Sequence, residues 1–157
     1  MTLIPFFINI KGIVFKTHSP LTVEEVMFGI DKYVEQIRAD EATAALVKAA
    51  KGKLIKATAY KNGKVKLSFK NLKIKKGAKA VRYQVYRSTS KNFKKNLKKY
   101  TFKRTANTKN YTWTNAKKLK KNTKYYYKVR VRVQLADGSY VYTKWSNVKS
   151  IKCKKTR

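Results

Sequence analysis

The chain has 157 residues, 43% of them hydrophobic, which is enough for one ordinary domain and an appendage. Its 40 lysines and arginines outnumber 7 aspartates and glutamates, giving a formal net charge of +33. A single cysteine and a single histidine exclude an intramolecular disulfide and a zinc-type ligand set.

The start of the chain, Met1 to Lys11, is apolar but lacks the basic n-region of a secretory signal. No apolar run is long enough to span a bilayer. We therefore expect mature sequence without a classical export signal and without a membrane span.

The charge is divided very unevenly along the chain. The first 51 residues carry six acids and six bases and are net neutral. From Gly52 onward there are 34 bases and one acid, Asp137, so this part carries the entire +33. The sequence thus predicts a neutral part, residues 1–52, followed by a polycationic part, residues 53–157.

The segment Leu3 to Lys16 is rich in Ile, Phe and Val on both prospective faces, which predicts one extended strand or arm covered on both sides. Such an arm needs a partner surface, either on the rest of the chain or on another subunit. The candidate assembly anchor consists of its apolar residues Phe6, Phe7, Ile8, Ile10, Val14 and Phe15.

Two short helices are expected next. Thr22 followed by Glu25 forms a capping box, and apolar residues at helical spacing predict a helix from Val23 to Arg38. A second, alanine-rich helix is expected from Glu41 to Lys51, started by Asp40 and stopped by Gly52.

Short strands with turn signals follow from Leu54. Asn62-Gly63 predicts a two-residue hairpin turn between Leu54–Lys61 and Lys64–Lys70. Trp113 is a plausible core residue, and Asp137-Gly138 predicts another turn. The other expected strands are Val81–Arg87, Tyr100–Arg104, Tyr111–Thr114, the long strand from Tyr125 to Val133, and a return through Tyr140, Tyr142 and Trp145 to a final strand.

The long strand has the clearest pattern in the chain. From Tyr125 to Val133 residues alternate, with Tyr and Val on one face, which indicates a half-buried strand. The lead-in residues Leu119, Thr123 and Tyr125 have the spacing of a tyrosine corner, in which the hydroxyl bonds back to the backbone. The other face is the candidate polyanion-contact face, made of Tyr126, Lys128, Arg130 and Arg132.

Four motifs together resemble the fibronectin type III domains of lysine-rich bacterial surface proteins, over about residues 54–155. They are Lys-Val-Lys-Leu-Ser-Phe (64–69), Ala-Val-Arg-Tyr-Gln-Val-Tyr-Arg-Ser-Thr-Ser (80–90), the tyrosine corner, and Lys-Trp-Ser-Asn-Val (144–148). The resemblance implies a mainly β fold, an immunoglobulin-like antiparallel β-sandwich preceded by the arm and one or two short helices. Phe69 stands where many such domains have Trp, and no Arg-Gly-Asp tripeptide supports integrin binding.

No catalytic constellation is evident. The polycationic part has one carboxylate and no histidine, whereas hydrolysis requires paired carboxylates or a nucleophile with a base. Asp137 is sufficiently explained by its turn, and His18 lies before the expected turn at Pro20. We predict a protein that is not an enzyme and has no catalytic residues, cofactor or metal.

The scarcity of acids in residues 53–157 predicts an anionic partner. Alternating lysines suit a solvated face and protect edge strands, but a merely soluble surface mixes both signs. The partner classes are nucleic acid, an acidic protein shell, and the teichoic acid and phosphate polymers of a bacterial envelope. Sequence-specific DNA recognition is not expected, because the basic residues are mostly lysines and form no helix that could enter a groove.

Charge, arm and resemblance favour a structural and interaction module, a bacteriophage virion accessory that decorates a capsid or tail. It would be made in the host cytoplasm and exposed after lysis, and the resemblance implies attachment to carbohydrate surfaces. One alternative is a nonspecific nucleic-acid-binding or packaging protein. The other is a fragment of an adhesin from the bacterial cell surface.

Overall fold

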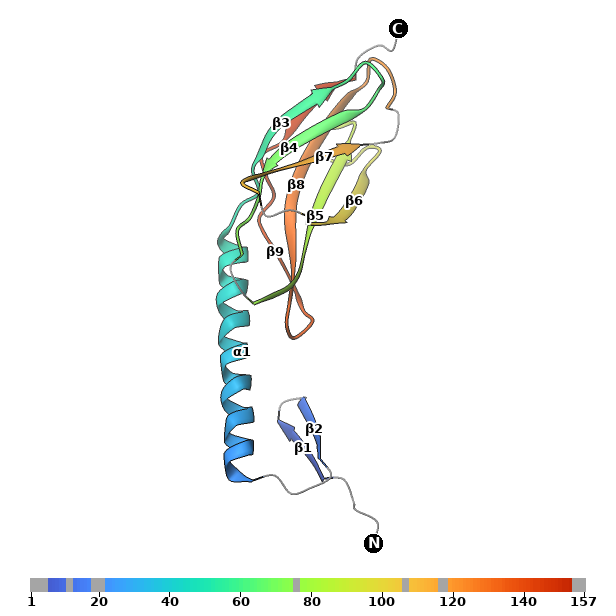
Figure 1. Ribbon diagram of the computed structural model, residues 1–157. Coiled ribbons are helices and arrows are strands. Elements are labelled where there is room, and N and C mark those ends of the chain that lie inside the picture. The colour runs from blue at the N-terminus through green and yellow to red at the C-terminus, as the bar shows by residue number, and fades with distance from the viewer. Residues whose placement is uncertain are drawn as a thin grey trace. The chain divides into compact units, whose positions relative to one another are not determined.

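The computed structural model describes residues 6–10, 13–17, 22–74, 77–105, 108–115 and 119–153, with the backbone alone for 6–17 (Figure 1). The chain divides into two compact units, Met1–Arg38 and Ala39–Arg157, and each is described by itself. Residues 39–51, on the N-terminal side of the predicted boundary at 52, belong to the second unit.

The first unit contains an antiparallel hairpin of β1 (Phe6–Ile10) and β2 (Ile13–Thr17). The prediction of a single extended strand from Leu3 to Lys16 is therefore wrong. Lys11-Gly12 separates the two strands, and a glycine in a two-residue connection is a hairpin signal. Because residues on both prospective faces are apolar, the pattern did not show where one strand ends and the next begins.

Helix α1 (Val23–Ala49) begins in the first unit and ends in the second. The predicted capping box is confirmed, because the Thr22 N–H donates to Glu25 Oε2 at 2.8 Å and the Glu25 N–H donates to Thr22 Oγ1 at 3.2 Å. The prediction of two helices separated at Asp40 is wrong. Instead of capping a helix, the Asp40 carboxylate accepts hydrogen bonds from the N–H groups of Ala136 and Asp137, both at 3.2 Å.

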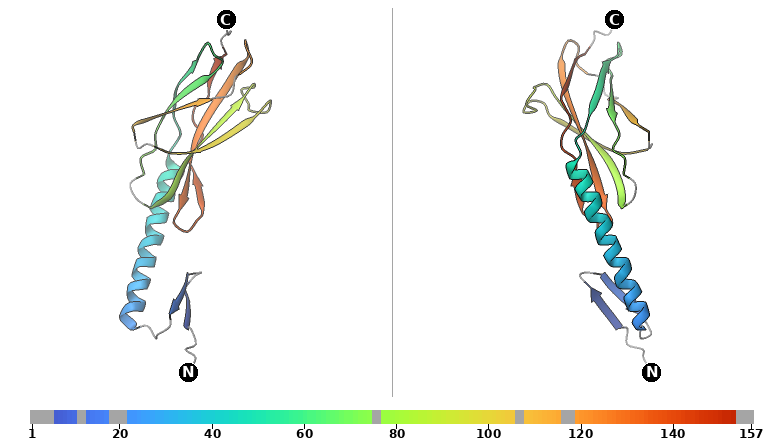
Figure 2. Two further views of the ribbon diagram at one scale, coloured as in Figure 1. Left: turned by 45° about the vertical axis from the view of Figure 1, so that its right-hand side comes forward. Right: turned by 90° about the vertical axis from the view of Figure 1, so that its left-hand side faces the viewer.

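The second unit is an antiparallel β-sandwich of the fibronectin type III-like kind, as predicted (Figures 1 and 2). One sheet has the order β3-β4-β7, and the other has the order β10-β8-β5-β6 with β9 also paired to β8. The first sheet comprises β3 (Leu54–Ala59), β4 (Val65–Lys70) and β7 (Asn110–Asn115). The second comprises β5 (Ala78–Ser88), β6 (Lys98–Lys103), β8 (Lys124–Leu135), β9 (Tyr140–Tyr142) and β10 (Lys149–Lys152).

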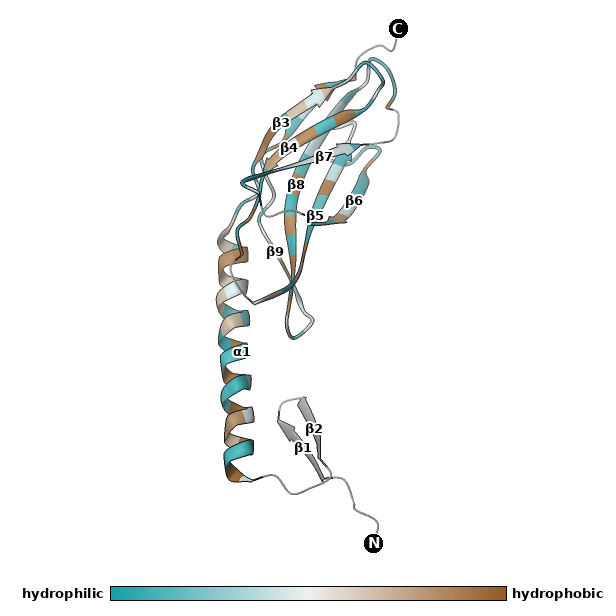
Figure 3. Cartoon of the chain, viewed as in Figure 1, coloured by the Kyte–Doolittle hydropathy of each residue, from teal (hydrophilic) through white to brown (hydrophobic). Residues whose placement is uncertain are grey.

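The predicted hairpin between β3 and β4 is present. Ala57 pairs with Leu67 and Ala59 with Val65, and Gly63 has a φ of 77°, which the turn requires and glycine adopts at no steric cost. Along β4 and β8 the alternation of hydrophilic and hydrophobic residues is visible in Figure 3. One set of alternate residues therefore faces the other sheet.

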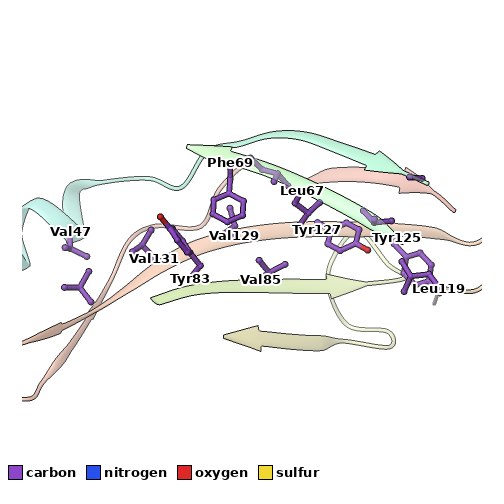
Figure 4. Packing of buried hydrophobic residues seen from close by; sticks show 14 of the residues in the cluster. Val47, Leu67, Phe69, Tyr83, Val85, Leu119, Tyr125, Tyr127, Val129 and Val131 are labelled. Carbon is purple, nitrogen blue, oxygen red and sulfur yellow. The ribbon is translucent and has the colours of Figure 1, made fainter. Parts of the chain in front are cut away.

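The core lies between the two sheets (Figure 4). Phe69 of β4 meets Tyr83 of β5 edge to face, with ring centroids 4.9 Å apart. Trp113 is half-buried and stacks on Phe102 of β6, with centroids 5.5 Å apart and planes 2° from parallel. Because β6 and β7 belong to different sheets, this aromatic pair bridges them.

The C-terminal part of α1 packs into the same core. Val47 is completely buried in the cluster that the strands form. Beyond the helix, the Gly52 N–H donates to the Lys144 carbonyl and the Lys144 N–H donates to the Ala50 carbonyl, both at 3.0 Å. The sequence between α1 and β3 is thus bonded to the segment that follows β9.

Candidate polyanion-binding face

The site is built on the outer face of β8. Alternate residues of this strand are buried, and the residues between them are half-buried on the opposite face. The structure therefore places the four predicted contact residues, Tyr126, Lys128, Arg130 and Arg132, in one row.

Each cation of this row lies over aromatic rings that the sequence analysis did not assign to the site. Lys128 Nζ is 4.4 Å from the Phe93 ring centroid and 4.6 Å from that of Trp145. The Arg130 guanidinium is 4.2 Å from the Tyr142 centroid and 4.4 Å from Trp145, and the Arg132 guanidinium is 3.6 Å from Tyr140. Such contacts stabilise by about 0.5–1 kcal/mol at exposed sites and by more where water is excluded.

Strand β9 supplies the two tyrosines. Arg132 pairs with Tyr142 and Gln134 with Tyr140 in the register, so each arginine lies over the ring diagonal to it. In the sequence, exposed Tyr140 and Tyr142 flank buried Val141, and this short alternation could have predicted that both rings share the outer face with the arginines.

Trp145 is positioned by the hydroxyl groups on either side of it. Thr143 Oγ1 accepts from the Val131 N–H at 3.0 Å, and Ser146 Oγ accepts from the Val129 N–H at 2.9 Å. The N–H groups of Thr143 and Ser146 in turn donate to the carbonyls of Val131 and Val129. The segment therefore continues alongside β8 after β9 ends, and Trp145 contacts both Lys128 and Arg130.

The neighbouring strand β5 fixes the row from its other side. Arg130 Nε donates to Gln84 Oε1 at 2.8 Å, and the rings of Tyr86 and Trp145 lie 4.4 Å apart. Burial, and next the charge of Arg130, lower the pKa of Lys128 from its ordinary value. The three cations are thus held by rings and an amide.

The acid nearest in sequence to this row is Asp137, in the turn between β8 and β9. Its carboxylate accepts from the Ser139 N–H at 2.8 Å, and hydrogen bonding to Ser139 lowers its pKa. Asp137 is the one acidic residue of the sequence after Gly52. Residues 53–157 therefore supply one carboxylate, and Asp40 of α1 adds a second at the same turn.

The tyrosine corner lies at the start of β8, before Lys128, Arg130 and Arg132 in the chain. Leu119 and Tyr125 are buried, and the Tyr125 hydroxyl accepts a hydrogen bond from the Lys120 N–H at 3.2 Å. Thr123 Oγ1 donates to the Lys121 carbonyl at 3.2 Å. This arrangement fixes the entry of the chain into β8.

Other residues singled out in the sequence are not described by the structure. His18 and the side chains of the candidate anchor, Phe6, Phe7, Ile8, Ile10, Val14 and Phe15, lie outside what the structure describes. Within the described residues, no group of three or more His, Cys, Asp or Glu is placed to hold a metal ion. The helix in the described part of the chain is not long and apolar enough to cross a membrane.

Comparisons with known proteins give fold neighbours at low identity. No family model and no curated protein matches the chain. The sensor domain of the anti-sigma factor RsgI4 in Pseudobacteroides cellulosolvens matches at 13% identity and a TM-score of 0.47, over 68% of this chain and 76% of that one. The chicken CNTN1 FN1-FN3 domains match at 15% and 0.48, over 68% of this chain and 33% of that one. The sixth fibronectin type III domain from human fibronectin type III domain containing protein 3 matches at 14% and 0.43, over 69% and 89%.

Proposed function

We propose that this protein is a non-enzymatic structural and interaction module that binds an anionic partner through its cationic fibronectin type III-like sandwich. The observation that carries the proposal is the charge: 34 bases and one acid from Gly52 onward. A fold that only had to be soluble would mix both signs, because this much like charge opposes compactness. An anionic partner removes that repulsion.

The first unit has the opposite character and is proposed as the assembly anchor. Residues 1–38 carry four acids and four bases, so their net charge is zero. The register of the β1–β2 hairpin pairs Ile8 with Phe15 and Ile10 with Ile13, which places these four apolar residues on one face. A two-stranded hairpin is marginal alone, so this face favours packing against a protein surface.

The part of α1 that belongs to this unit also exposes large apolar side chains. Val23 is 79% exposed, Met27 53% and Phe28 62%. Exposed apolar residues gathered on one element indicate a protein contact more than a charged ligand. Neighbouring protein subunits are the proposed partners of this surface.

We place such an anchored, cationic display module on a bacteriophage virion, as a decoration of the capsid or tail. There the anchor would contact capsid or tail subunits, and the sandwich would contact anionic polymers or carbohydrate of the bacterial surface. The contrast between a neutral unit and a cationic one supports assigning assembly contacts to the first and anion contacts to the second.

The test compares incorporation of the full chain with that of a variant lacking residues 1–16. Virions assembled with each protein are purified and probed for it. We expect the truncated protein to retain the circular dichroism and unfolding midpoint of the sandwich but to be absent from virions. Incorporation of the truncated protein at the full level would refute the anchor, and absence of the full chain would refute the virion assignment.

A further inference from the structure

We infer that the row Lys128, Arg130 and Arg132, here called the cation ladder, binds a flexible single phosphodiester chain laid along β8. This inference rests on the proposed function, since it specifies the anion that the sandwich recognises. The starting observation is that the three cations are oriented by aromatic rings on one sheet face.

The spacing of the ladder suits an extended chain. Alternate residues of a strand are about 6.6 Å apart, twice the rise of about 3.3 Å per residue. Each strand of a duplex advances only about 3.4 Å along the helix axis per phosphate, because its backbone winds around that axis and curves away from a flat sheet face. A flexible single chain can instead lie straight along β8, so that its successive phosphates meet successive cations of the ladder.

The type of cation suits phosphate. Guanidinium groups bind phosphate oxygens through two parallel hydrogen bonds, and two of the three rungs are arginines. Arg130 uses Nε on Gln84, and the rings of Tyr142 and Trp145 flank its guanidinium. Its orientation is therefore set before the ligand arrives, which lowers the entropic cost of binding.

The flanking tyrosine rings offer a stacking contact that an anion without aromatic groups cannot make. Tyr140 is 43% exposed and Tyr142 36% exposed, beside Arg132 and Arg130. Unpaired bases stack on such rings, whereas paired bases inside a duplex cannot reach them. A single-stranded nucleic acid and a poly(glycerol phosphate) share the backbone chemistry, but only the nucleic acid can use the exposed tyrosines.

The chain offers a matched control for charge alone. Lys56 of β3 and Lys66 and Lys70 of β4 are exposed lysines on the other sheet. Replacing all three by glutamine removes the same charge as Lys128→Gln, Arg130→Gln and Arg132→Gln together. Diffuse attraction predicts equal losses from the two triple variants, whereas the ladder predicts unequal ones.

The experiment measures binding of the full chain and both triple variants across a salt series. The probes are single-stranded oligothymidylate, a DNA duplex of the same length, poly(glycerol phosphate) and polyaspartate. We expect the wild type to prefer the two single phosphodiester chains. The ladder variant should lose about tenfold or more in affinity for them, with the salt slope reduced by about 0.7 per lost phosphate contact, and the control variant should lose little.

Two further variants keep the result interpretable. Arg130→Lys with Arg132→Lys retains the charge but removes two-point phosphate binding, so we expect a loss of affinity between those of the wild type and the ladder variant. This double variant replaces the ladder variant in the test if the ladder variant does not fold. Tyr140→Ala with Tyr142→Ala removes both the stacking surface and the rings that orient the two arginines, so it should weaken both phosphodiester chains. A larger loss for oligothymidylate indicates nucleic acid as the source, and equal losses indicate an envelope polymer.

Three results would overturn the inference. Equal losses in the two triple variants would mean diffuse charge, and polyaspartate binding as tight as that of the phosphodiester chains would mean no phosphate recognition. Duplex binding as tight as single-strand binding would remove the argument for a single chain laid along β8. In all three cases the sandwich still binds anions and the proposed function stands. If the wild type bound none of the four probes at physiological salt, the proposal of an anionic partner would itself be refuted.

Discussion

The hydroxyl groups of Tyr83 and Tyr125 are hydrogen-bonded at the margins of the core. Tyr83 is fully buried, and its hydroxyl donates to Asn71 Oδ1, while Asn71 Nδ2 donates to the Thr108 carbonyl at 2.8 Å. This chain of contacts links the segment after β4 to the loop before β7. The Asn71 side chain thus connects two segments that are distant in sequence, and the Tyr83 hydroxyl holds that side chain in place.

Removing the Tyr125 hydroxyl should destabilise the sandwich. Tyr125→Phe deletes the acceptor of the Lys120 N–H and should lower the free energy of unfolding by about 1 kcal/mol. Urea unfolding of this variant beside Tyr126→Phe, on the half-buried outer face, measures the difference. Equal midpoints for the two variants and the wild type would contradict this role of the corner.

Burial raises the pKa of Tyr83 from its ordinary value of 10.0 to about 12. Between these values the unfolded chain has lost this proton while the folded chain retains it, so stability should fall as the pH rises from 10 towards 12. Tyr83→Phe should make that fall less steep than in the wild type. The free energy of unfolding measured across this range tests it, and parallel pH profiles would show that Tyr83 is not responsible.

At the scale of elements, the sequence predicted what depends on neighbouring residues. The Thr22 cap, the hairpin at Asn62-Gly63 and the alternation of β8 are local signals, and the structure has all three. Asp40 shows the limit, because as a local signal it favours a helix start. Its actual partners, Ala136 and Asp137, lie almost a hundred residues away.

The candidate face was predictable to the same extent. Alternation alone placed Tyr126, Lys128, Arg130 and Arg132 together. The rings over the cations come from β9, from the segment of Trp145 and from the loop of Phe93. Tyr140 and Tyr142 follow from the predicted Asp137-Gly138 turn and the alternation of β9. The positions of Trp145 and Phe93 beside β8 depend on the tertiary fold, so these two partners could not be assigned from spacing within one strand.

The packing of α1 on the sandwich can be tested at Gly77. Its φ of +83° favours glycine, and a Cβ there would lie 2.6 Å from Thr43 Oγ1 and 3.1 Å from the Ala39 carbonyl oxygen. Gly138 has a similar φ of +89° but nothing within 4 Å of such a Cβ. Gly138→Ala should therefore cost only the backbone strain, about 1–2 kcal/mol, and Gly77→Ala should cost more.

Chemical denaturation gives the free energy of unfolding of both variants, and the difference between their losses of stability is the steric cost at Gly77. Amide hydrogen exchange in residues 39–49 should accelerate in Gly77→Ala alone, because the clash acts on this part of α1. Equal destabilisation by the two substitutions would mean that the approach of Gly77 to the helix contributes nothing.

At the scale of the whole molecule, self-repulsion should limit stability. A chain with net charge +33 is destabilised at low ionic strength, and salt screens exposed charges beyond a Debye length of about 10 Å at 0.1 M. We expect the thermal unfolding midpoint to rise as sodium chloride is added from low ionic strength. A midpoint that is constant or falls with salt would show that repulsion between the cations does not determine the stability of this fold.

Cys153, directly after β10, gives the molecule a built-in chemical reporter. It is the one cysteine of the sequence and is 1% exposed, and its N–H donates to the Thr123 carbonyl at 3.0 Å. A thiol reagent cannot reach a buried sulfur, so alkylation has to wait until this end of the sandwich opens. The alkylation rate therefore counts openings of the strand pair β8–β10 in the native protein, without any engineered label.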